Sequence, residues 1–266
     1  MEIDLNDHDQ LWFPGLAESL VLRHEATAPG QGDHQQFEPH ERTQERSDFS
    51  RPTLQLGQNV IAIEYPQSAI ALRFSELSFA AIDPERARDQ LQEAADVLGI
   101  VDGLVDTLGL LVRKVYLLEA PVGYDVSHSD PGLPFSIFLS LPKLGETDAA
   151  LRVAEALLHE AMHLQLTMIE HWVPLITDDL QDGYSPWKHE IRPVGGLLHG
   201  LYVFAVIHQT CGLLMRVRDG FRGYGNTRRS EIENEVAVLP EHPRGLSPVG
   251  SDVWHKCWHS VLCSGQ

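Results

Sequence analysis

The stretch His159-Glu160-Ala161-Met162-His163 matches the pattern HExxH and is the most informative part of this chain. Its two histidines are four residues apart, so on a helix both imidazoles leave the same face, close enough to share one metal ion. The pattern therefore predicts a metal site on a helix. The alternative is a solvated helix face that carries two unrelated histidines.

The residues around this stretch favour a helix over Thr147–Trp172. Apolar residues recur there near a 3.6-residue period: Leu151, Ala154, Leu158, Ala161, and Leu164 or Gln165. Thr147 and Asp148 supply a capping start, and Pro174 follows the expected end. This context makes the metal site the better interpretation of the two histidines.

The composition limits the classes of function. The chain has 266 residues and a formal net charge of −18, which argues against a nucleic-acid-binding surface because nothing would offset phosphate repulsion. We find no secretory signal pattern and no run of 18 or more apolar residues, so we expect no membrane partner and a cytoplasmic protein. Three cysteines give an odd count and no disulfide framework, which fits a reducing compartment.

The overall pattern predicts a mostly α fold with a small β-sheet (α+β), in which the HExxH helix packs against a second long apolar helix. We expect a single domain over 1–266, with a polar loop or disordered insertion near 28–57 and a metal-binding core near 127–218. The expected strands are Asn59–Glu64, Arg113–Glu119 and Pro134–Leu141. The other expected elements are a helix from Asp83-Pro84 that breaks near Gly99 or Gly103, an irregular segment Val173–Arg192, a helix Gly195–Arg218, and a weak capping box at Ser230–Glu233.

A metal held by two histidines needs a third protein ligand. The extended pattern HExxHxxGxxH fails, because Leu166 and Ile169 stand where Gly and His are required. Glu170 and His171 lie too close along the same helix to bend back onto the metal, whereas His189 and Glu190 remain candidates.

His199 is the strongest candidate for the third ligand, because it is the lone ionisable group in the apolar run LLHGLYVFAV. Burying an imidazole there is costly without a partner, and a metal is one such partner. The alternative is a core histidine bonded to a backbone carbonyl. The neighbouring Gly200 would allow two helices to approach closely.

Two further features are weaker. Arg192 comes seven residues before His199, and its planar guanidinium suits a carboxylate; the alternative is an ordinary surface arginine. His255, Cys257, His259 and Cys263 form a second group near the C-terminus, but they lack a standard zinc-ligand spacing. An ordinary amphipathic terminal helix is the preferred interpretation of that group.

The combination of HEAMH, RPVGGLLHGLYVFA some thirty residues later and LPFSIFLSLP ahead resembles a known family. This family is the HExxH-type peptide modification proteins of ribosomal peptide natural-product pathways, described as 2-oxoglutarate-dependent peptide β-hydroxylases. The similarity covers roughly 127–207. It implies non-haem Fe(II) bound by His159, His163 and His199, with Arg192 receiving the distal carboxylate of 2-oxoglutarate. The implied substrate is a ribosomally made precursor peptide.

The resemblance also implies the role of Glu160. In a hydroxylase Glu160 does not activate water but supports a metal ligand or a metal-bound water. The first alternative function is a zinc metallopeptidase, in which Glu160 is the general base and the strand Phe135–Leu141 pairs with an extended substrate. The second is a non-catalytic module that binds a leader peptide.

Overall fold

The computed structural model describes residues 9–13, 15–27, 52–121, 123–143, 145–178 and 180–263. It is mostly helical, with 54% of residues in helices, and it contains a five-stranded mixed sheet and a hairpin. The predicted α+β class is therefore confirmed. Most of the polar stretch predicted near 28–57 lies outside the described residues, but residues 53–56 form a strand.

The sheet is small and mixed. Its strands are β1 (Thr53–Leu56), β2 (Asn59–Glu64), β3 (Lys114–Leu118), β4 (Ser127–Ser129) and β5 (Ser136–Ser140). Their order is β1-β2-β3-β5-β4. The neighbours β2, β3 and β5 run parallel, whereas β1 and β4 pair antiparallel at the two edges. Because β5 is flanked by β3 and β4, the expectation that its strand pairs with a substrate is wrong; β4 has the free edge.

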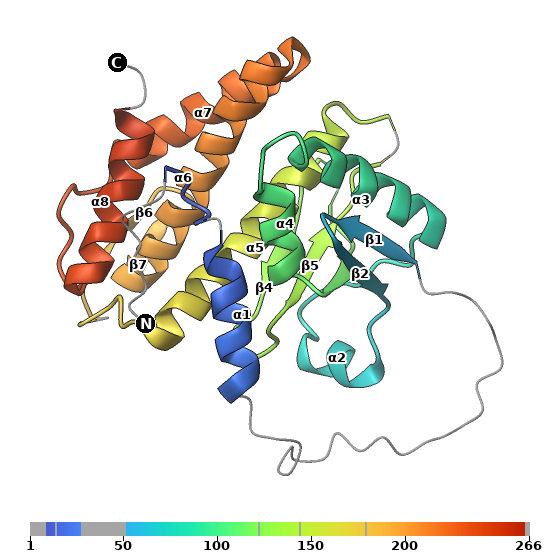
Figure 1. The fold of residues 1–266 in the computed structure, drawn as a ribbon, viewed down its shortest axis with the longest axis horizontal. Coiled ribbons are helices and arrows are strands. Elements are labelled where there is room, and N and C mark those ends of the chain that lie inside the picture. The colour runs from blue at the N-terminus through green and yellow to red at the C-terminus, as the bar shows by residue number, and fades with distance from the viewer. Residues whose placement is uncertain are drawn as a thin grey trace.

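The helices surround the sheet and extend beyond it. They are α1 (Leu16–Thr27), α2 (Ser68–Arg73), α3 (Pro84–Leu98), α4 (Leu104–Leu111), α5 (Ala149–Trp172), α6 (Val194–Val217), the 3₁₀ turn η1 (Asp219–Phe221), α7 (Arg222–Val236) and α8 (Pro248–Leu262). Figure 1 shows α5 between the sheet on one side and α6, α7 and α8 on the other. The predicted packing of the HExxH helix, α5, against the long apolar helix, α6, is confirmed.

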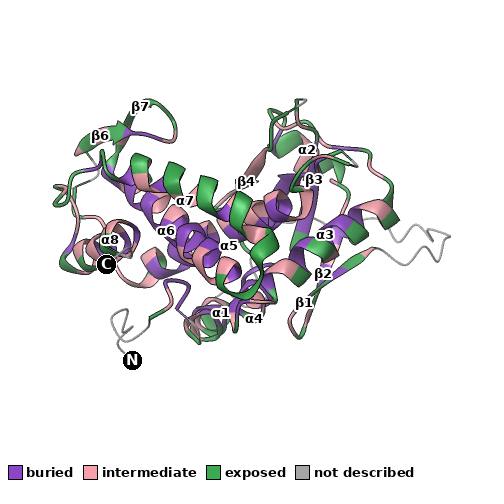
Figure 2. Cartoon of the chain, turned by 90° about the horizontal axis from the view of Figure 1, so that it is seen from above, coloured by how far each residue is buried: buried purple, intermediate pink, exposed green. Residues whose placement is uncertain are grey.

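The core follows α5 and α6. The periodic apolar residues of α5 that the sequence singled out are all buried: Leu151, Ala154, Leu158, Ala161, Leu164 and Gln165. Figure 2 shows the buried residues concentrated along these two helices. Within the described part of the chain, only α6 is long and apolar enough to span a membrane, and 67% of its most apolar window is buried inside the fold.

A short N-terminal segment fastens α5 to α6. Gln165 of α5 donates from Nε2 to the Trp12 carbonyl at 2.8 Å and to Tyr202 Oη of α6 at 3.0 Å. The Tyr202 hydroxyl donates to the Leu11 carbonyl at 3.1 Å, and the Leu11 N–H donates to Gln209 Oε1 at 2.9 Å. Because buried polar groups are costly unless they are paired, these bonds fix how the two helices face each other.

The structure confirms some of the local predictions and contradicts others. The helix start at Asp83-Pro84 is confirmed, with the Asp83 side chain accepting from two backbone N–H groups, and the break falls between Leu98 and Leu104. Asp148 does precede α5, but its side chain makes no capping bond. The capping box at Ser230–Glu233 is wrong, because α7 already begins at Arg222. The segment expected to be irregular contains a hairpin, β6 (Asp182–Ser185) with β7 (Glu190–Pro193).

Candidate metal centre

The two histidines of HEAMH line a cavity of about 440 Å³. Its walls come from α5, from the first three turns of α6, from β4 with the residues after it, and from the hairpin segment 185–192. His159 and His163 lie on the α5 face that turns away from the buried core of the helix. The spacing of four residues therefore places both imidazoles on the same wall of a cavity that is large enough for a small ligand.

His199 meets the other two histidines in this cavity. His163 Nε2 lies 3.2 Å from His159 Nε2, and His163 Nδ1 lies 3.2 Å from His199 Nδ1. The rings of His163 and His199 are stacked, with centroids 5.5 Å apart. The sequence separation between these two residues is 36, so only the packing of α6 on α5 brings the third imidazole to the HExxH pair.

Glu170 contacts His199 at the ring nitrogen that does not face His163. Its Oε2 lies 2.9 Å from His199 Nε2, and both side chains are mostly shielded, at 28% and 21% exposure. Glu170 comes seven residues after His163, two helical turns further along the same face of α5. A carboxylate that accepts from one ring nitrogen fixes the orientation of the imidazole and leaves the other nitrogen, here Nδ1, free to face the cavity.

Burial keeps the two α5 histidines neutral. It is the main cause that lowers the pKa of His159 to about 4, and the positive charges of Arg228 and Lys188 add to this effect. It also lowers the pKa of His163 well below its usual value, helped by the neighbouring His159 and His199. A neutral imidazole has the lone pair that a metal ion needs, so no proton has to be displaced at pH 7.

The donor chemistry of this site fits a metal ion, but the ring orientations are not those of a coordinated one. Two nitrogens bound to one ion at about 2.1 Å lie roughly 3.0–3.4 Å apart, which the observed spacings match. However, His163 faces its two neighbours with different nitrogens, and no described group of three or more His, Cys, Asp or Glu is arranged to hold an ion. A turn of the His163 ring is required before three nitrogens meet at one point.

Glu160 is the buried acid of the site. Its side chain is 3% exposed, and Oε1 lies 3.9 Å from His159 Nε2. The Ser127 hydroxyl on the edge strand β4 donates to Oε1 at 2.6 Å. Burial raises the pKa of this carboxyl, and hydrogen bonds from Ser127 and Ser129 act in the opposite direction. The serines of β4 therefore hold Glu160 in place at the wall of the cavity.

Arg192 lines the same cavity as the histidines. It lies on β7 and folds over Gly196, one turn before His199: a Cβ added to Gly196 would stand 3.4 Å from Arg192 Nε. Its side chain is 40% exposed, and Nη1 lies 3.5 Å from Glu190 Oε1. This ion pair is exposed to solvent and its N···O distance is long, so the guanidinium is still able to bind another carboxylate.

The other two ligand candidates lie elsewhere. Neither His189 nor Glu190 is among the residues that line the cavity. His189 is exposed, and its Nδ1 lies 3.2 Å from Tyr184 Oη. Glu190 is 59% exposed and pairs with Arg192. Of the candidates for a third ligand, the structure brings His199 alone to the HExxH pair.

Trp187 fixes the hairpin over the site, a contact that the sequence did not suggest. Its ring stacks on Phe204 of α6, with centroids 5.1 Å apart, and a Cβ added to Gly200 would stand 2.5 Å from this indole. Gly200 therefore makes room for Trp187, and the expectation that it allows two helices to approach is wrong. The same Phe204 ring meets His159 edge-on at 5.4 Å.

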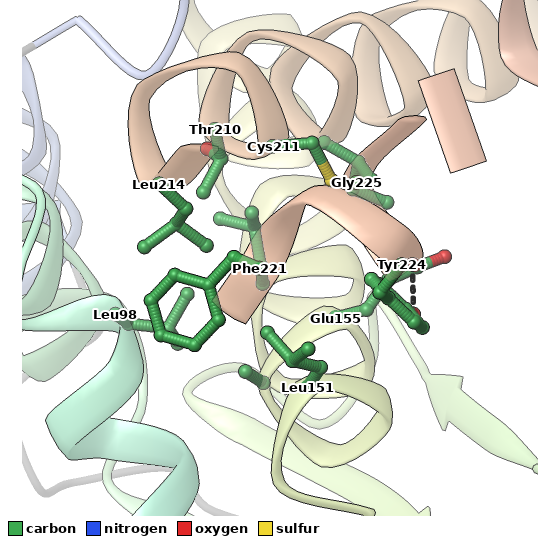
Figure 3. A pocket seen from close by; sticks show the side chains of 12 residues that line it. Leu98, Leu151, Glu155, Thr210, Cys211, Leu214, Phe221, Tyr224 and Gly225 are labelled. Atoms are coloured by element: carbon green, nitrogen blue, oxygen red, sulfur yellow. Dashed lines mark hydrogen bonds between the residues drawn. The ribbon is translucent and has the colours of Figure 1, made fainter. Parts of the chain in front are cut away.

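A second, smaller cavity lies among α3, α5, α6 and α7 (Figure 3). Its volume is about 20 Å³, which is room for about one water molecule. Leu98, Leu151 and Phe221 form much of its lining, and Figure 3 shows these side chains pointing toward one another. It lacks the convergent polar groups of a small-molecule site, so we interpret it as a packing gap.

A polar network at the rim of this gap leads back to the histidines. Tyr224 Oη donates to Glu155 Oε2 at 2.6 Å, the bond drawn in Figure 3, and Arg228 Nε donates to Glu155 Oε1 at 2.8 Å. Glu155 precedes His159 by one helical turn. Burial raises the pKa of Tyr224 further above its usual range. These residues stabilise the contact between α5 and α7 beside the metal centre.

The histidines and cysteines of the C-terminal group do not converge on one point. His255 Nε2 lies 2.6 Å from His242 Nδ1, and Cys263 Sγ lies 3.6 Å from His259 Nδ1, which gives two separate pairs on the surface. Cys257 points into the core, where burial raises the pKa of its thiol to about 12. The arrangement matches the preferred interpretation, an amphipathic helix α8 with a buried face.

The comparisons with known proteins add no relative. No protein-family model matches the sequence, and no curated protein is significantly similar to it. What can be argued about function therefore rests on the site itself and on the residues that carry the family resemblance.

Proposed function

We propose that this chain is a non-haem Fe(II)/2-oxoglutarate-dependent dioxygenase that hydroxylates a β-carbon of a residue in a ribosomally made precursor peptide. One observation carries the proposal: histidines of α5 and α6 meet in a cavity that also contains an arginine suited to a dicarboxylate. The residues that would hold the metal are His159, His163 and His199. Three nitrogen ligands would leave positions on the ion open for a 2-oxo acid and O₂.

The chemistry of the bound iron is the activation of O₂ coupled to decarboxylation of 2-oxoglutarate, which gives succinate, CO₂ and the hydroxylated residue. The protein supplies orientation. Glu170 holds the His199 ring, and Arg192, which lines the cavity, would offer a planar pair of donors to the distal carboxylate of 2-oxoglutarate. Glu160, fixed by Ser127, supports His159 from the wall of the cavity.

The peptide substrate has an open strand to pair with. The strand β4 is the edge of the sheet and carries Ser127 and Ser129, which line the cavity. An extended peptide adds to such an edge through main-chain hydrogen bonds, and this would bring one of its residues next to the histidines. The partner we propose is thus a peptide in the cytoplasm, not a nucleic acid or a membrane.

A zinc metallopeptidase is the second candidate, and the position of Glu160 favours it. The carboxylate is buried, its pKa is raised, and it lies beside His159 at the cavity wall. A general base for a zinc-bound water needs this placement and a pKa nearer to neutrality. Against it stand the missing HExxHxxGxxH pattern and Arg192 in the same cavity.

Metal analysis after anaerobic purification, followed by an assay for succinate from 2-oxoglutarate, tests the proposal. We expect one iron per chain and succinate formation that depends on Fe(II) and O₂, with His159→Ala as the inactive control. Cleavage of peptides with added Zn²⁺ and without a 2-oxo acid would establish the peptidase instead. Peptide binding without either activity would leave a non-catalytic binding module.

A further inference from the structure

The His159 ring is not oriented by a carboxylate, as the ring of His199 is. Glu170 lies 2.9 Å from His199, whereas the Oε1 atom of Glu160 is 3.9 Å from His159 Nε2, beyond hydrogen-bond distance. Among the described residues, the only contact of hydrogen-bond length that the His159 ring makes is with His163. Rotation of an imidazole about its Cβ–Cγ bond has a broad energy profile. A contact of another kind is therefore needed to fix the direction of its lone pairs.

Phe204 of α6 supplies such a contact. Its ring meets the His159 ring edge-to-face, with centroids 5.4 Å apart and an angle of 71° between the ring planes. This is one of the favourable arrangements for two aromatic rings. Both residues line the same cavity, so the contact joins α5 to α6 at the metal centre. The Phe204 ring thereby limits the orientations that the His159 imidazole can adopt.

The Phe204 ring is itself held by two neighbours. Trp187, in the turn between β6 and β7, stacks on it with centroids 5.1 Å apart and an angle of 23° between the planes. The guanidinium carbon of Arg228 on α7 lies 5.2 Å from the ring centroid, within the range of a cation–π contact. Arg228 is fixed in turn, because it donates to Glu155 at 2.8 Å and to Glu231 at 3.0 Å. The ring is therefore held from the hairpin and from α7.

The hairpin packs on α6 through this same tryptophan. Gly200 precedes Phe204 by one helical turn, so the two residues lie on one face of α6. A Cβ added to Gly200 would stand 2.5 Å from the Trp187 indole, which shows how closely the indole lies against the helix. The opposite face of the hairpin is exposed at the cross-strand pair of Tyr184 and Ile191. Trp187 therefore links the hairpin to the aromatic ring that contacts His159.

We propose that Phe204 positions His159 for metal binding and that Trp187 acts through Phe204, so that the packing of the hairpin on α6 affects the metal affinity of the site. Both are positioning residues, because neither side chain has a lone pair to offer to an ion. The inference requires a metal at the three histidines but does not require the hydroxylase reaction. A zinc peptidase would need the same orientation of His159.

The Zn²⁺ affinity of the full-length protein, measured by competition with a chelator of known affinity, tests the inference. Phe204→Leu keeps an apolar side chain but removes the ring, and it is expected to lower the affinity by about three- to tenfold, the effect of losing one aromatic contact. Trp187→Leu is expected to lower it by a smaller factor. Trp187→Phe keeps a stacking ring and should recover most of that loss. Tyr184→Leu, on the exposed face of the same hairpin, is the matched control.

Combining Trp187→Leu with Phe204→Leu gives a readout that a merely structural role would not move. The double variant is expected to bind Zn²⁺ as strongly as Phe204→Leu alone, because residues that act through one contact do not have additive effects. Additive losses, or unchanged affinity in Phe204→Leu, overturn the inference. Where Phe204→Leu does not fold by circular dichroism, the Trp187 variants decide: equal affinity in Trp187→Leu, Trp187→Phe and Tyr184→Leu overturns it.

The succinate assay on the unaltered protein separates this inference from the proposed function. Zn²⁺ affinities that change as expected, without succinate formation by the unaltered protein, refute the hydroxylase alone. Succinate formation by the unaltered protein, with unchanged Zn²⁺ affinity in Phe204→Leu and Trp187→Leu, refutes the positioning role alone.

Discussion

Glu170 Oε2 lies 2.9 Å from His199 Nε2, so a carboxylate of α5 holds the one histidine of the site that comes from α6. This contact spans 29 residues of sequence and links the two long helices at the cavity. It also determines which nitrogen of His199 faces the other histidines. Carboxylates that orient a metal-bound imidazole affect affinity even though they do not touch the ion.

Removing this carboxylate is expected to weaken metal binding. Glu170→Ala should lower the affinity for one Fe(II) or Zn²⁺ per chain by about 10- to 100-fold, because His199 loses the partner that fixes its ring. Glu170→Gln keeps an acceptor oxygen and should lose less. Competition with a chelator of known affinity measures the effect. Equal affinity in Glu170→Ala and the unaltered protein would show that His199 is not a ligand or does not need orienting.

The ligand set itself is tested at His199. His199→Ala is expected to abolish tight binding of one metal per chain while the circular dichroism of the helices is retained, because only two histidines remain. His189→Ala is the matched control, since that histidine is exposed and contacts Tyr184 outside the cavity. Undiminished stoichiometry in His199→Ala would remove this residue from the site.

Glu160→Gln separates the two enzyme hypotheses. A peptidase loses its general base and therefore about 10²–10⁴ in turnover. For the hydroxylase we expect a loss of less than about a hundredfold together with weaker metal retention, because Gln still accepts a hydrogen bond from Ser127. Succinate formation and metal content are measured on the same preparations. A loss of three orders of magnitude with full metal content would contradict a supporting role.

The sequence was sufficient to predict the two long helices α5 and α6 and the three histidines that they bring together. The 3.6-residue period of α5 and the apolar run of α6 are strong local signals, and the histidine pair of HExxH with the lone histidine of LLHGLYVFAV identifies what faces the cavity. Glu170 was set aside because it shares a helix with the HExxH pair. The reasoning considered only the reach of that side chain to a metal, whereas in the structure it reaches His199, which α6 brings beside it.

The hairpin could not be predicted for a different reason. The residues 182–193 carry two prolines, two aromatic residues and several charges without a period of two, so nothing in the pattern indicated strands. The position of Trp187 depends on its contacts with Gly200 and Phe204, which only the folded chain reveals. The capping box at Ser230–Glu233 failed because the pattern is uninformative once a helix has begun upstream.

A buried histidine outside the metal centre is expected to make stability depend on pH. His208 is 2% exposed, and its Nε2 lies 2.9 Å from Glu233 Oε1 and 3.0 Å from Arg229 Nε. Burial is the main cause that lowers its pKa from 6.5. Below pH 6.5 the His208 imidazole therefore becomes protonated in the unfolded chain while it stays neutral to a lower pH in the folded chain. The free energy of unfolding falls as the pH falls.

The variant His208→Gln should remove this part of the pH dependence while keeping an acceptor for Arg229. The slope it removes is at most about 1.4 kcal/mol per pH unit, the value for one full proton. Urea unfolding at pH 7.5 and pH 5.5 measures it, with the exposed His171→Gln as control. Identical slopes for His208→Gln and the unaltered protein would mean that His208 is protonated to the same extent in both states.

Arg192 is expected to recognise the distal carboxylate of 2-oxoglutarate. A guanidinium offers two parallel N–H groups to a carboxylate, which an ammonium reproduces poorly. Arg192→Lys should therefore raise the dissociation constant of 2-oxoglutarate by about ten- to a hundredfold and leave Fe(II) binding unchanged. Anaerobic titration of the Fe(II)-loaded protein, followed by its charge-transfer absorption, measures this constant. Arg216→Lys, exposed at the other end of α6, is the control.

The same titration identifies what replaces Arg192 if the constant does not change. Two other arginines were natural substitutes on sequence grounds, but the structure engages both. Arg152 is bound by Asp125 and Glu146, and Arg113 pairs with Glu25 and does not line the cavity. An unchanged constant in Arg192→Lys would therefore leave Lys188 as the remaining lysine or arginine among the described residues that line the cavity.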